Sequence, residues 1–375
     1  MLDDRRLHGS LIDAPGSRER LNTPALVIDI DALERNIEKM ASLARAKGVR
    51  LRPHAKTHKS AEIARRQIAA GAVGVCCAKL GEAEALAAEG VSSILLTSPV
   101  VTMPGLQRLA ALNAQLKELI VVVDHPDNAR LLAKAVYPNT LQVLIDVDPG
   151  IRRTGVISPE AAAQLYEVIS SLPQLRYRGL QYYCGLQQHV AAFAERRDAI
   201  AERTEYLKTV VAQVGQPEIV SGGGTGTCHI DAELGVINEW QVGSYVFMDR
   251  QYADCDLAGA GVQPFDFALL IDTRVVSANS TGIATCDAGF KAMATDAGQP
   301  KIIAGAPEGA GYHFMGDEHG LVVDPALKHS WELADKLSLA VPHCDPTVNL
   351  YDAYHVVREN VLVDIWPVTA RGRSR

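Results

Sequence analysis

Leu119-Ile120-Val121-Val122-Val123 is an apolar, mostly β-branched run with no polar residue inside it. Strands of a parallel sheet that is covered on both faces have this continuous pattern. Seven further strand-like runs lie nearby, and longer helical patterns separate them. They occupy residues 25–30, 49–56, 72–78, 93–98, 141–148, 175–183 and 218–221. Eight strands in strict strand-then-helix order predict an α/β fold with a (β/α)8 barrel, and a doubly wound open sheet is the alternative.

The pattern changes after about residue 240. Strand-like runs at 267–272, 321–323 and 361–365 follow one another without a long helical segment between them. This spacing predicts a second, mostly β domain. We therefore expect the barrel over residues 22–250 and the β domain over residues 251–375, with residues 1–21 packing on the β domain.

The composition excludes several classes of protein. A net charge of −7 over 375 residues disfavours nucleic acid and anionic membrane surfaces as partners. No apolar stretch of about 18 residues indicates a transmembrane helix. Seven scattered cysteines suit reduced thiols better than a disulfide framework. We expect a globular, cytoplasmic protein.

Reactive side chains follow several of the predicted barrel strands. Lys56 ends the second strand, within Arg52-Pro53-His54-Ala55-Lys56-Thr57-His58-Lys59. Arg152 and Arg153 follow the sixth strand, and Tyr182, Tyr183 and His189 follow the seventh. The βα loops of a barrel gather at the C-terminal ends of its strands, so these groups are expected on one face. A lysine at that mouth can form a Schiff base if its amine is kept neutral.

A glycine run follows the eighth predicted strand, in Ser221-Gly222-Gly223-Gly224-Thr225. Glycines let backbone amides approach an anion closely, and a short helix beginning near Thr225 would add its positive dipole end. TIM barrels often bind a phosphate after strands seven and eight. We therefore predict a phosphate site here, although a triple glycine can also be a flexible turn.

A second candidate site lies in Val341-Pro342-His343-Cys344-Asp345-Pro346-Thr347-Val348-Asn349. In an extended segment, residues two apart point to the same side, so His343 and Asp345 could hold one metal ion while Cys344 faces away. One imidazole and one carboxylate, completed by oxygen ligands, suit Mn²⁺ or Mg²⁺. A thiolate in place of Asp345 would have favoured zinc.

From residue 22 to the C-terminus, these segments taken together resemble the D-threonine aldolase and D-serine dehydratase family, the metal-dependent branch of the fold shared with alanine racemase. The resemblance rests on Arg52–Lys59, on Arg153-Thr154-Gly155-Val156, on the segment 243–249 and on His343–Asn349. The His-Cys-Asp-Pro-Thr string is similar to the metal motif of D-threonine and 3-hydroxy-D-aspartate aldolases, whereas D-serine dehydratases typically carry His-x-Cys. One departure is Ala78, which stands where the family has Gln near the cofactor.

The resemblance implies a role for each candidate residue. Lys56 would carry pyridoxal 5'-phosphate (PLP), Arg153 would contact its phenolic oxygen, and Tyr183 would face its pyridine nitrogen. Independently of the resemblance, His189, which follows the seventh strand, could act as the general base. The phosphate would be held by Gly223, Gly224, Thr225 and Tyr245, and the divalent metal by His343 and Asp345, with Asp317 as a carboxylate that holds metal-bound water.

The implied activity is retro-aldol cleavage of a D-β-hydroxy-α-amino acid, of the D-threonine or 3-hydroxy-D-aspartate type, to glycine and an aldehyde. The fold further implies a homodimer. One alternative is a dehydratase of D-serine or D-threo-3-hydroxyaspartate, which would release a 2-oxo acid and ammonia. Others are a non-catalytic PLP carrier and a metal-dependent barrel hydrolase without PLP. The side chain that the substrate carries is left open.

Overall fold

The computed structural model describes residues 2–375, and the chain forms two compact units. The barrel unit contains residues 38–243, 255–264 and 372–375. The β unit contains the residues up to Ile37 together with 244–254 and 265–371. The chain passes from one unit to the other within helix α2 (Ile30–Lys47).

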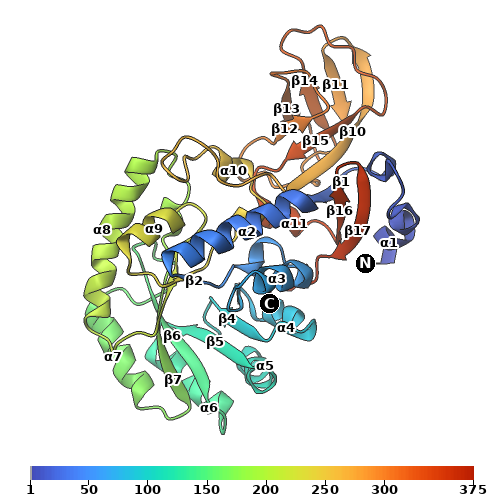
Figure 1. The fold of residues 1–375 in the computed structure, drawn as a ribbon. Coiled ribbons are helices and arrows are strands. Elements are labelled where there is room, and N and C mark those ends of the chain that lie inside the picture. The colour runs from blue at the N-terminus through green and yellow to red at the C-terminus, as the bar shows by residue number, and fades with distance from the viewer. Residues whose placement is uncertain (1) are drawn as a thin grey trace. The chain divides into compact units, whose positions relative to one another are not determined.

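An eight-stranded parallel sheet forms the centre of the barrel unit, with the strand order β2-β9-β8-β7-β6-β5-β4-β3 (Figure 1). A parallel bridge between His54 and Cys76 joins the segments at its two ends. This confirms the predicted α/β architecture with a barrel-like parallel sheet. The strands are β2 (Arg50–Leu51), β3 (Val75–Cys77), β4 (Ser93–Leu96), β5 (Glu118–Val123), β6 (Leu141–Val147), β7 (Leu175–Tyr182), β8 (Ile219–Gly222) and β9 (Glu239–Trp240).

Helices alternate with these strands, and three of them begin at Ser or Thr capping residues. The side chains of Ser60, Thr102 and Ser158 accept a backbone hydrogen bond at the start of α3, α5 and α7. In Figure 1 the helices α5 to α8 lie along the outside of the sheet. The helices are α3 (Ala61–Ala69), α4 (Leu80–Ala88), α5 (Met103–Gln115), α6 (Pro126–Val136), α7 (Pro159–Ser170), α8 (Phe193–Val211) and α9 (Cys228–Leu234).

The apolar run 119–123, which lies in β5, is buried on both faces of the sheet. Ile120 and Val122 of β5 belong to a core cluster with Cys76, Leu95, Leu144 and Ile219 of neighbouring strands. The intervening residues Leu119 and Val121 are each 2% exposed. Burial of both side-chain sets explains why the strand has no polar alternation.

The β unit is built on a nine-stranded sheet of mixed direction. Its main path is β13-β14-β11-β10-β1-β16-β17, and β15 pairs with both β10 and β12. The strands are β1 (Ala25–Asp29), β10 (Leu269–Ser280), β11 (Ile283–Cys286), β12 (Lys301–Ala304), β13 (Gly311–Phe314), β14 (Gly320–Val323), β15 (Lys336–Ala340), β16 (Ala353–Arg358) and β17 (Val361–Pro367).

The strand predicted at residues 25–30 was assigned to the wrong sheet. As β1 it pairs antiparallel with β10 and parallel with β16, so it is a central strand of the β unit. The eighth barrel strand is instead β9, which has only two residues and therefore no periodic signal in the sequence. The number of parallel barrel strands was right, but one member was wrong.

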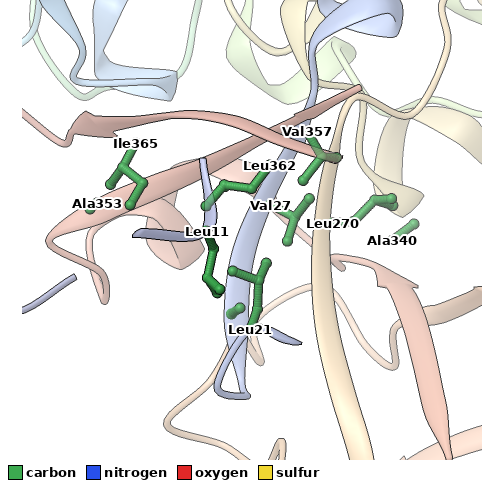
Figure 2. Packing of buried hydrophobic residues seen from close by; sticks show 10 residues of the cluster. Leu11, Leu21, Val27, Leu270, Ala340, Ala353, Val357, Leu362 and Ile365 are labelled. Atoms are coloured by element: carbon green, nitrogen blue, oxygen red, sulfur yellow. The ribbon is translucent and has the colours of Figure 1, made fainter. Parts of the chain in front are cut away.

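The first residues of the chain pack against this sheet. Figure 2 shows Leu11 and Leu21 beside Val27, Leu270 and Leu362 in one apolar cluster. Arg18 adds a two-pronged ion pair, with its Nε 2.8 Å from Asp272 Oδ2 and its Nη2 2.9 Å from Oδ1. The N-terminal segment, which includes α1 (Leu2–His8), is thus an integral part of the β unit. Among the described residues, no helix is both long and apolar enough to span a membrane.

Candidate active site

Lys56 lies on a short 3-10 turn, η3 (Ala55–Thr57), rather than on the strand itself. The regular strand is shorter than the predicted strand 49–56, although backbone pairing continues past Pro53, where the His54 amide donates to the Val242 carbonyl oxygen at 3.0 Å. His54 Nδ1 accepts the Lys56 backbone amide at 3.4 Å, so its Nε2 carries the proton and lies 3.1 Å from Thr97 Oγ1. The ring thereby fixes the turn, and the Lys56 side chain is half-buried.

The neighbouring lysines are in different surroundings. Lys59 Nζ lies 2.8 Å from Glu82 Oε1, and both side chains are buried. Glu82 Oε2 in turn accepts the Ala78 backbone amide at 2.7 Å. The Lys59 amine is therefore already engaged in a buried ion pair, and breaking that pair would leave Glu82 buried without its partner. Lys79 is exposed to solvent. Of the three lysines, Lys56 has the surroundings that suit a covalent cofactor.

The loop after β6 is shaped around Asp148. Its Oδ1 accepts the amides of Gly150, Ile151 and Arg152 at 2.9, 2.8 and 3.0 Å, and Arg152 takes a left-handed φ of 58°. This turn directs the next residue, Arg153, over the ring of Tyr183, with the guanidinium carbon 5.5 Å from the ring centroid. The structure thus brings together two residues that the sequence analysis selected separately.

A carboxyl group beneath this loop was not predicted. Asp146 accepts hydrogen bonds from Thr154 Oγ1 at 2.7 Å and from Gln181 Nε2 at 2.9 Å. Burial raises the pKa of Asp146 to about 6, against the lowering effect of those two hydrogen bonds. A cavity of about 770 Å³ opens beside Arg153, and Arg152 and Arg203 also line it. Asp124 and Asp148 line the same cavity, so its lining carries charges of both signs.

The glycine-rich loop has no room for side chains. A Cβ on Gly222 would lie 2.0 Å from the Tyr182 carbonyl oxygen, and one on Gly223, whose φ is 70°, would lie 2.6 Å from Asp231 Oδ2. Thr225 is buried. The loop therefore has the close-packed glycine backbone that a phosphate cradle requires. Helix α9 begins at Cys228, three residues later than the sequence suggested.

The Gly224 amide is used inside the protein. It donates to Thr227 Oγ1 at 3.1 Å. The expectation that all three glycine amides approach an anion is therefore revised: Gly224 contributes its small size. His189 lies half-buried on the loop after β7, next to the fully buried Gln188. Tyr245 lies in the β unit, on η5 (Ser244–Val246), where its buried ring packs 5.7 Å from that of Phe265.

His343 and Asp345 lie close together in the β unit, with His343 Nε2 3.9 Å from Asp345 Oδ2. They are not on an extended segment: His343 caps helix α11 (Cys344–Val348), and Asp345 is in its first turn. A separation of 3.9 Å is shorter than two metal–ligand bonds of about 2.1 Å each, so one ion could bind both groups. The donor set fits the predicted divalent metal.

Two aspartates near this pair were missed by the sequence analysis. Asp296 Oδ2 lies 2.8 Å from His343 Nδ1, which orients the ring and leaves Nε2 toward Asp345. Asp249 Oδ2 accepts the Cys344 amide at 3.0 Å and so holds the start of α11. Neither aspartate stands in a spacing pattern that relates it to His343, so no local signal could have found them.

The neighbouring thiol is unsuited to metal binding. Cys344 is fully buried, its Sγ lies 3.5 Å from the Met248 carbonyl oxygen, and burial raises the thiol pKa well above its usual value. A thiol that resists ionisation is a poor ligand. Asp317, predicted to hold metal-bound water, is exposed, and its Oδ2 lies 3.8 Å from Lys291 Nζ. Its role stays a prediction.

A further histidine cluster joins Asp4, His8 and His355 within the β unit. His8 Nδ1 lies 2.9 Å from His355 Nε2, and His8 Nε2 accepts the Asn22 backbone amide at 3.1 Å. Because a backbone amide can only donate, His8 must carry its proton on Nδ1, the atom that faces His355. That tautomer explains the pair as a hydrogen bond between neutral rings, and it leaves His8 Nδ1 unable to bind a metal.

Comparisons with known proteins agree with this geometry. Residues 28–251 match the family model for the N-terminal domain of alanine racemase, and residues 268–357 match a putative serine dehydratase domain. The chain is 38% identical to a 3-hydroxy-D-aspartate aldolase of Paracoccus denitrificans (strain Pd 1222), covering 96% of this chain and 95% of that protein. It is 36% identical to a D-threonine aldolase of an Arthrobacter species, covering 95% and 94%.

A solved structure is similar to this chain over nearly its whole length. The crystal structure of D-threonine aldolase from Filomicrobium marinum superposes with a TM-score of 0.90 at 38% sequence identity, covering 94% of this chain and 97% of that one.

Proposed function

We propose that this chain, which belongs to the alanine racemase-like family of 3-hydroxy-D-aspartate and D-threonine aldolases, is a lyase that cleaves D-β-hydroxy-α-amino acids to glycine and an aldehyde. The observation that carries the proposal is the set of groups that follow the C-terminal ends of the barrel strands. Lys56, the Arg153–Tyr183 pair and the close-packed glycine loop all belong to that end.

The same residues suit PLP. Lys56 would bind the aldehyde carbon of PLP, and Arg153 would contact its phenolic oxygen. Tyr183 would face its pyridine nitrogen. Gly223, Thr225 and Tyr245 would hold the phosphate, and Gly224, whose amide donates to Thr227, would contribute its small size. When bound, PLP supplies an electron sink for the pair released as the Cα–Cβ bond breaks. The permanent charge of Arg153 would favour the anionic form of that phenolic oxygen.

Cleavage also requires that the substrate β-hydroxyl lose its proton. His189 would take that proton, because a half-buried imidazole on a loop at the barrel mouth is a suitable general base. His343 and Asp345 would hold Mn²⁺ or Mg²⁺, whose positive charge lowers the pKa of a nearby hydroxyl. Asp296 fixes the ring that the cation requires, and Asp317 would position water.

The dehydratase alternative is less well supported. Asp345 offers an oxygen ligand at the position where the dehydratase motif carries a thiolate, and the only thiol in the segment 341–349, Cys344, is turned toward a carbonyl oxygen. The aldolases of Paracoccus denitrificans and of the Arthrobacter species are 38% and 36% identical over 96% and 95% of this chain, whereas a D-threo-3-hydroxyaspartate dehydratase of Delftia sp. is 32% identical over 74% of it.

Product analysis tests the proposed function. The purified protein, loaded with PLP and Mn²⁺, is incubated with D-threonine and with a D-β-hydroxyaspartate, and L-threonine is the control. We expect glycine and an aldehyde from the D-substrates alone. Exhaustive chelation should stop turnover while leaving the absorption of bound PLP in place, and Mn²⁺ or Mg²⁺ should restore it. Ammonia and a 2-oxo acid as main products, or full activity after chelation, would overturn the proposal.

The metal assignment has its own test in Asp296. Replacing it with Asn removes the negative charge beside His343 Nδ1 while keeping the side chain's size. We expect the Mn²⁺ affinity, measured by titration of the chelated enzyme, to fall roughly 10- to 100-fold, the usual effect of losing a carboxylate partner of a histidine ligand. Asp254→Asn, on the exposed i,i+4 pair with Arg250, is the control. Unchanged Mn²⁺ affinity in Asp296→Asn would contradict the assignment.

We also propose that the protein is a cytoplasmic homodimer. This rests on the fold family and on the composition. Light scattering should give twice the chain mass of 40.3 kDa, and cell fractionation should recover the activity with the cytosol. A fully active species of single-chain mass would rule out the dimer.

A further inference from the structure

Gln188 is a fully buried glutamine between two loops of the barrel mouth. It directly precedes His189, on the loop after β7. Its Oε1 accepts the Gly226 amide at 3.1 Å, and its Nε2 donates to the Cys184 carbonyl oxygen and to Thr227 Oγ1, both at 3.2 Å. A backbone amide can only donate and a carbonyl can only accept, so these partners fix the orientation of the amide.

The glycine-rich loop is shaped to admit this side chain. A Cβ on Gly224 would lie 2.4 Å from Gln188 Oε1, and a Cβ on Gly226 would lie 2.0 Å from the Gln188 carbonyl oxygen. Both distances are shorter than any real contact between such atoms. The absence of side chains at these two positions is therefore explained by Gln188, independently of any ligand.

Thr227 extends the contact into the start of α9. Its hydroxyl accepts the Gly224 amide at 3.1 Å and Gln188 Nε2 at 3.2 Å, and it donates to Asp231 Oδ2 at 2.8 Å. Because the Thr227 oxygen accepts two hydrogen bonds, its hydrogen is directed toward Asp231. Gln188, Thr227 and Asp231 thus form a directed chain of hydrogen bonds, and all three residues are buried. Such chains hold a geometry rigidly when every member has its partner.

We propose that Gln188 is a positioning residue that holds the glycine-rich loop and the His189 loop in one arrangement. On the proposed function, which this inference assumes, one loop receives the cofactor phosphate and the other carries the general base. Loss of the Gln188 amide should release both loops. The expected result is a loss of affinity specific to the phosphate, together with a fall in kcat.

The test compares Gln188→Ala with Gln187→Ala. Gln187 is the adjacent glutamine, only partly buried, and serves as the matched control. Apoenzyme is titrated by absorbance with PLP and with pyridoxal, which lacks the phosphate. We expect Gln188→Ala to bind PLP about 10- to 100-fold more weakly, from the loss of several buried hydrogen bonds. Pyridoxal binding should change less than about three-fold, and Gln187→Ala should match the wild type.

A second variant guards against a folding defect in Gln188→Ala. Thr227→Val removes the hydroxyl that links Gln188 to Asp231 while keeping the side chain's shape, and it should show the same selective loss of PLP affinity. Melting temperatures identify any variant that fails to fold. At saturating PLP, kcat of Gln188→Ala should fall by at least about 10-fold because His189 is displaced.

The outcomes separate this inference from the proposed function. Equal weakening of PLP and pyridoxal in folded variants, or a wild-type PLP affinity and kcat in Gln188→Ala, would overturn the role of Gln188. A wild-type enzyme that binds PLP but releases no glycine would overturn the proposed reaction, and the ratio of the two affinities would still decide the role of Gln188.

Discussion

The two ends of the barrel sheet carry similar charged residues in opposite states. At the N-terminal end, the first residues of β9 and β5 hold the buried Arg52 side chain, with its Nε 3.1 Å from Glu239 Oε1 and its Nη2 3.1 Å from Glu118 Oε2. At the C-terminal end, Arg153 is exposed and its guanidinium lies over Tyr183. The first arginine is held in buried ion pairs with carboxylates, while the second is exposed at the barrel mouth. For these two arginines, burial in ion pairs makes one charge structural, and exposure leaves the other available to a ligand.

The segment 52–59 contains both kinds of residue. Arg52 is ion-paired at the N-terminal end of the barrel, and Lys56 lies at the barrel mouth. Lys59 forms a buried ion pair with Glu82. Substitutions at the mouth should therefore remove activity and preserve the fold. Substitutions among the paired charges should do the reverse.

The largest contrast is expected between Lys56→Ala and Lys59→Ala. Lys56→Ala should abolish turnover and the visible absorption of lysine-bound PLP, with little change in stability. Lys59→Ala leaves Glu82 buried without its cation. Breaking a buried pair in this way should lower the free energy of unfolding by about 3 to 5 kcal/mol. Spectra after borohydride reduction and urea unfolding measure the two effects. Borohydride-trapped PLP in Lys56→Ala would assign the cofactor to another lysine.

His189→Ala tests the mouth a second time. We expect kcat to fall by roughly 10² to 10⁴, the usual contribution of a positioned general base. His125→Ala, on the exposed start of α6, should leave kcat unchanged. If the kcat of His189→Ala stayed within two-fold of the wild type, the base would have to be another group.

Glu239→Gln tests the N-terminal end of the barrel. Glu239 Oε1 accepts from Arg52 Nε at 3.1 Å and from Ser221 Oγ at 3.0 Å. Removing its charge should lower the free energy of unfolding by about 3 kcal/mol and leave kcat within two-fold. Glu233→Gln, in an exposed pair with Arg197, should lower it by less than about 1 kcal/mol. A large loss of kcat in Glu239→Gln would show that the two ends are not separate.

A last prediction concerns the pH dependence of stability. Burial raises the pKa of Asp231 from its ordinary value of 3.8 to about 7, against the lowering effect of the Thr227 hydrogen bond. Between these two values the folded protein keeps a proton that the unfolded chain has released, so stability falls as the pH rises through this range. The stability of Asp231→Asn relative to the wild type should therefore increase from pH 4 to 7 and level off above. Urea unfolding at several pH values measures it, and a flat difference would contradict the buried carboxyl.

Local sequence was sufficient for most of the barrel but not for assigning strands to sheets. The run Leu119–Val123 is apolar because both of its faces are buried, and this can be read without knowing its neighbours. The run Ala25–Asp29 has the same apolar character, yet its partners are β10 and β16, which are more than 240 residues away. Nothing within such a short run distinguishes the two sheets. β9 was missed because two residues carry no period.

The candidate site divides in the same way. Lys56, Arg153, Tyr183, the glycine run and the pair His343–Asp345 could be selected from residue type, motif and position after a strand, because these properties belong to contiguous segments. Asp296, Gln188 and the pairing of Lys59 with Glu82 could not. Each depends on a hydrogen bond between residues that are distant in the chain.

By itself, therefore, the sequence determined which chemical groups are present and which strands they follow along the chain. Only the tertiary structure decided which lysine is locked in an ion pair, which of two adjacent glutamines is buried, and which aspartate orients His343. The physical reason is that propensity and periodicity act over a few neighbouring residues. Burial and hydrogen-bond pairing are set by whatever the fold brings alongside, and they decide whether a polar group holds the protein together or remains available to a ligand.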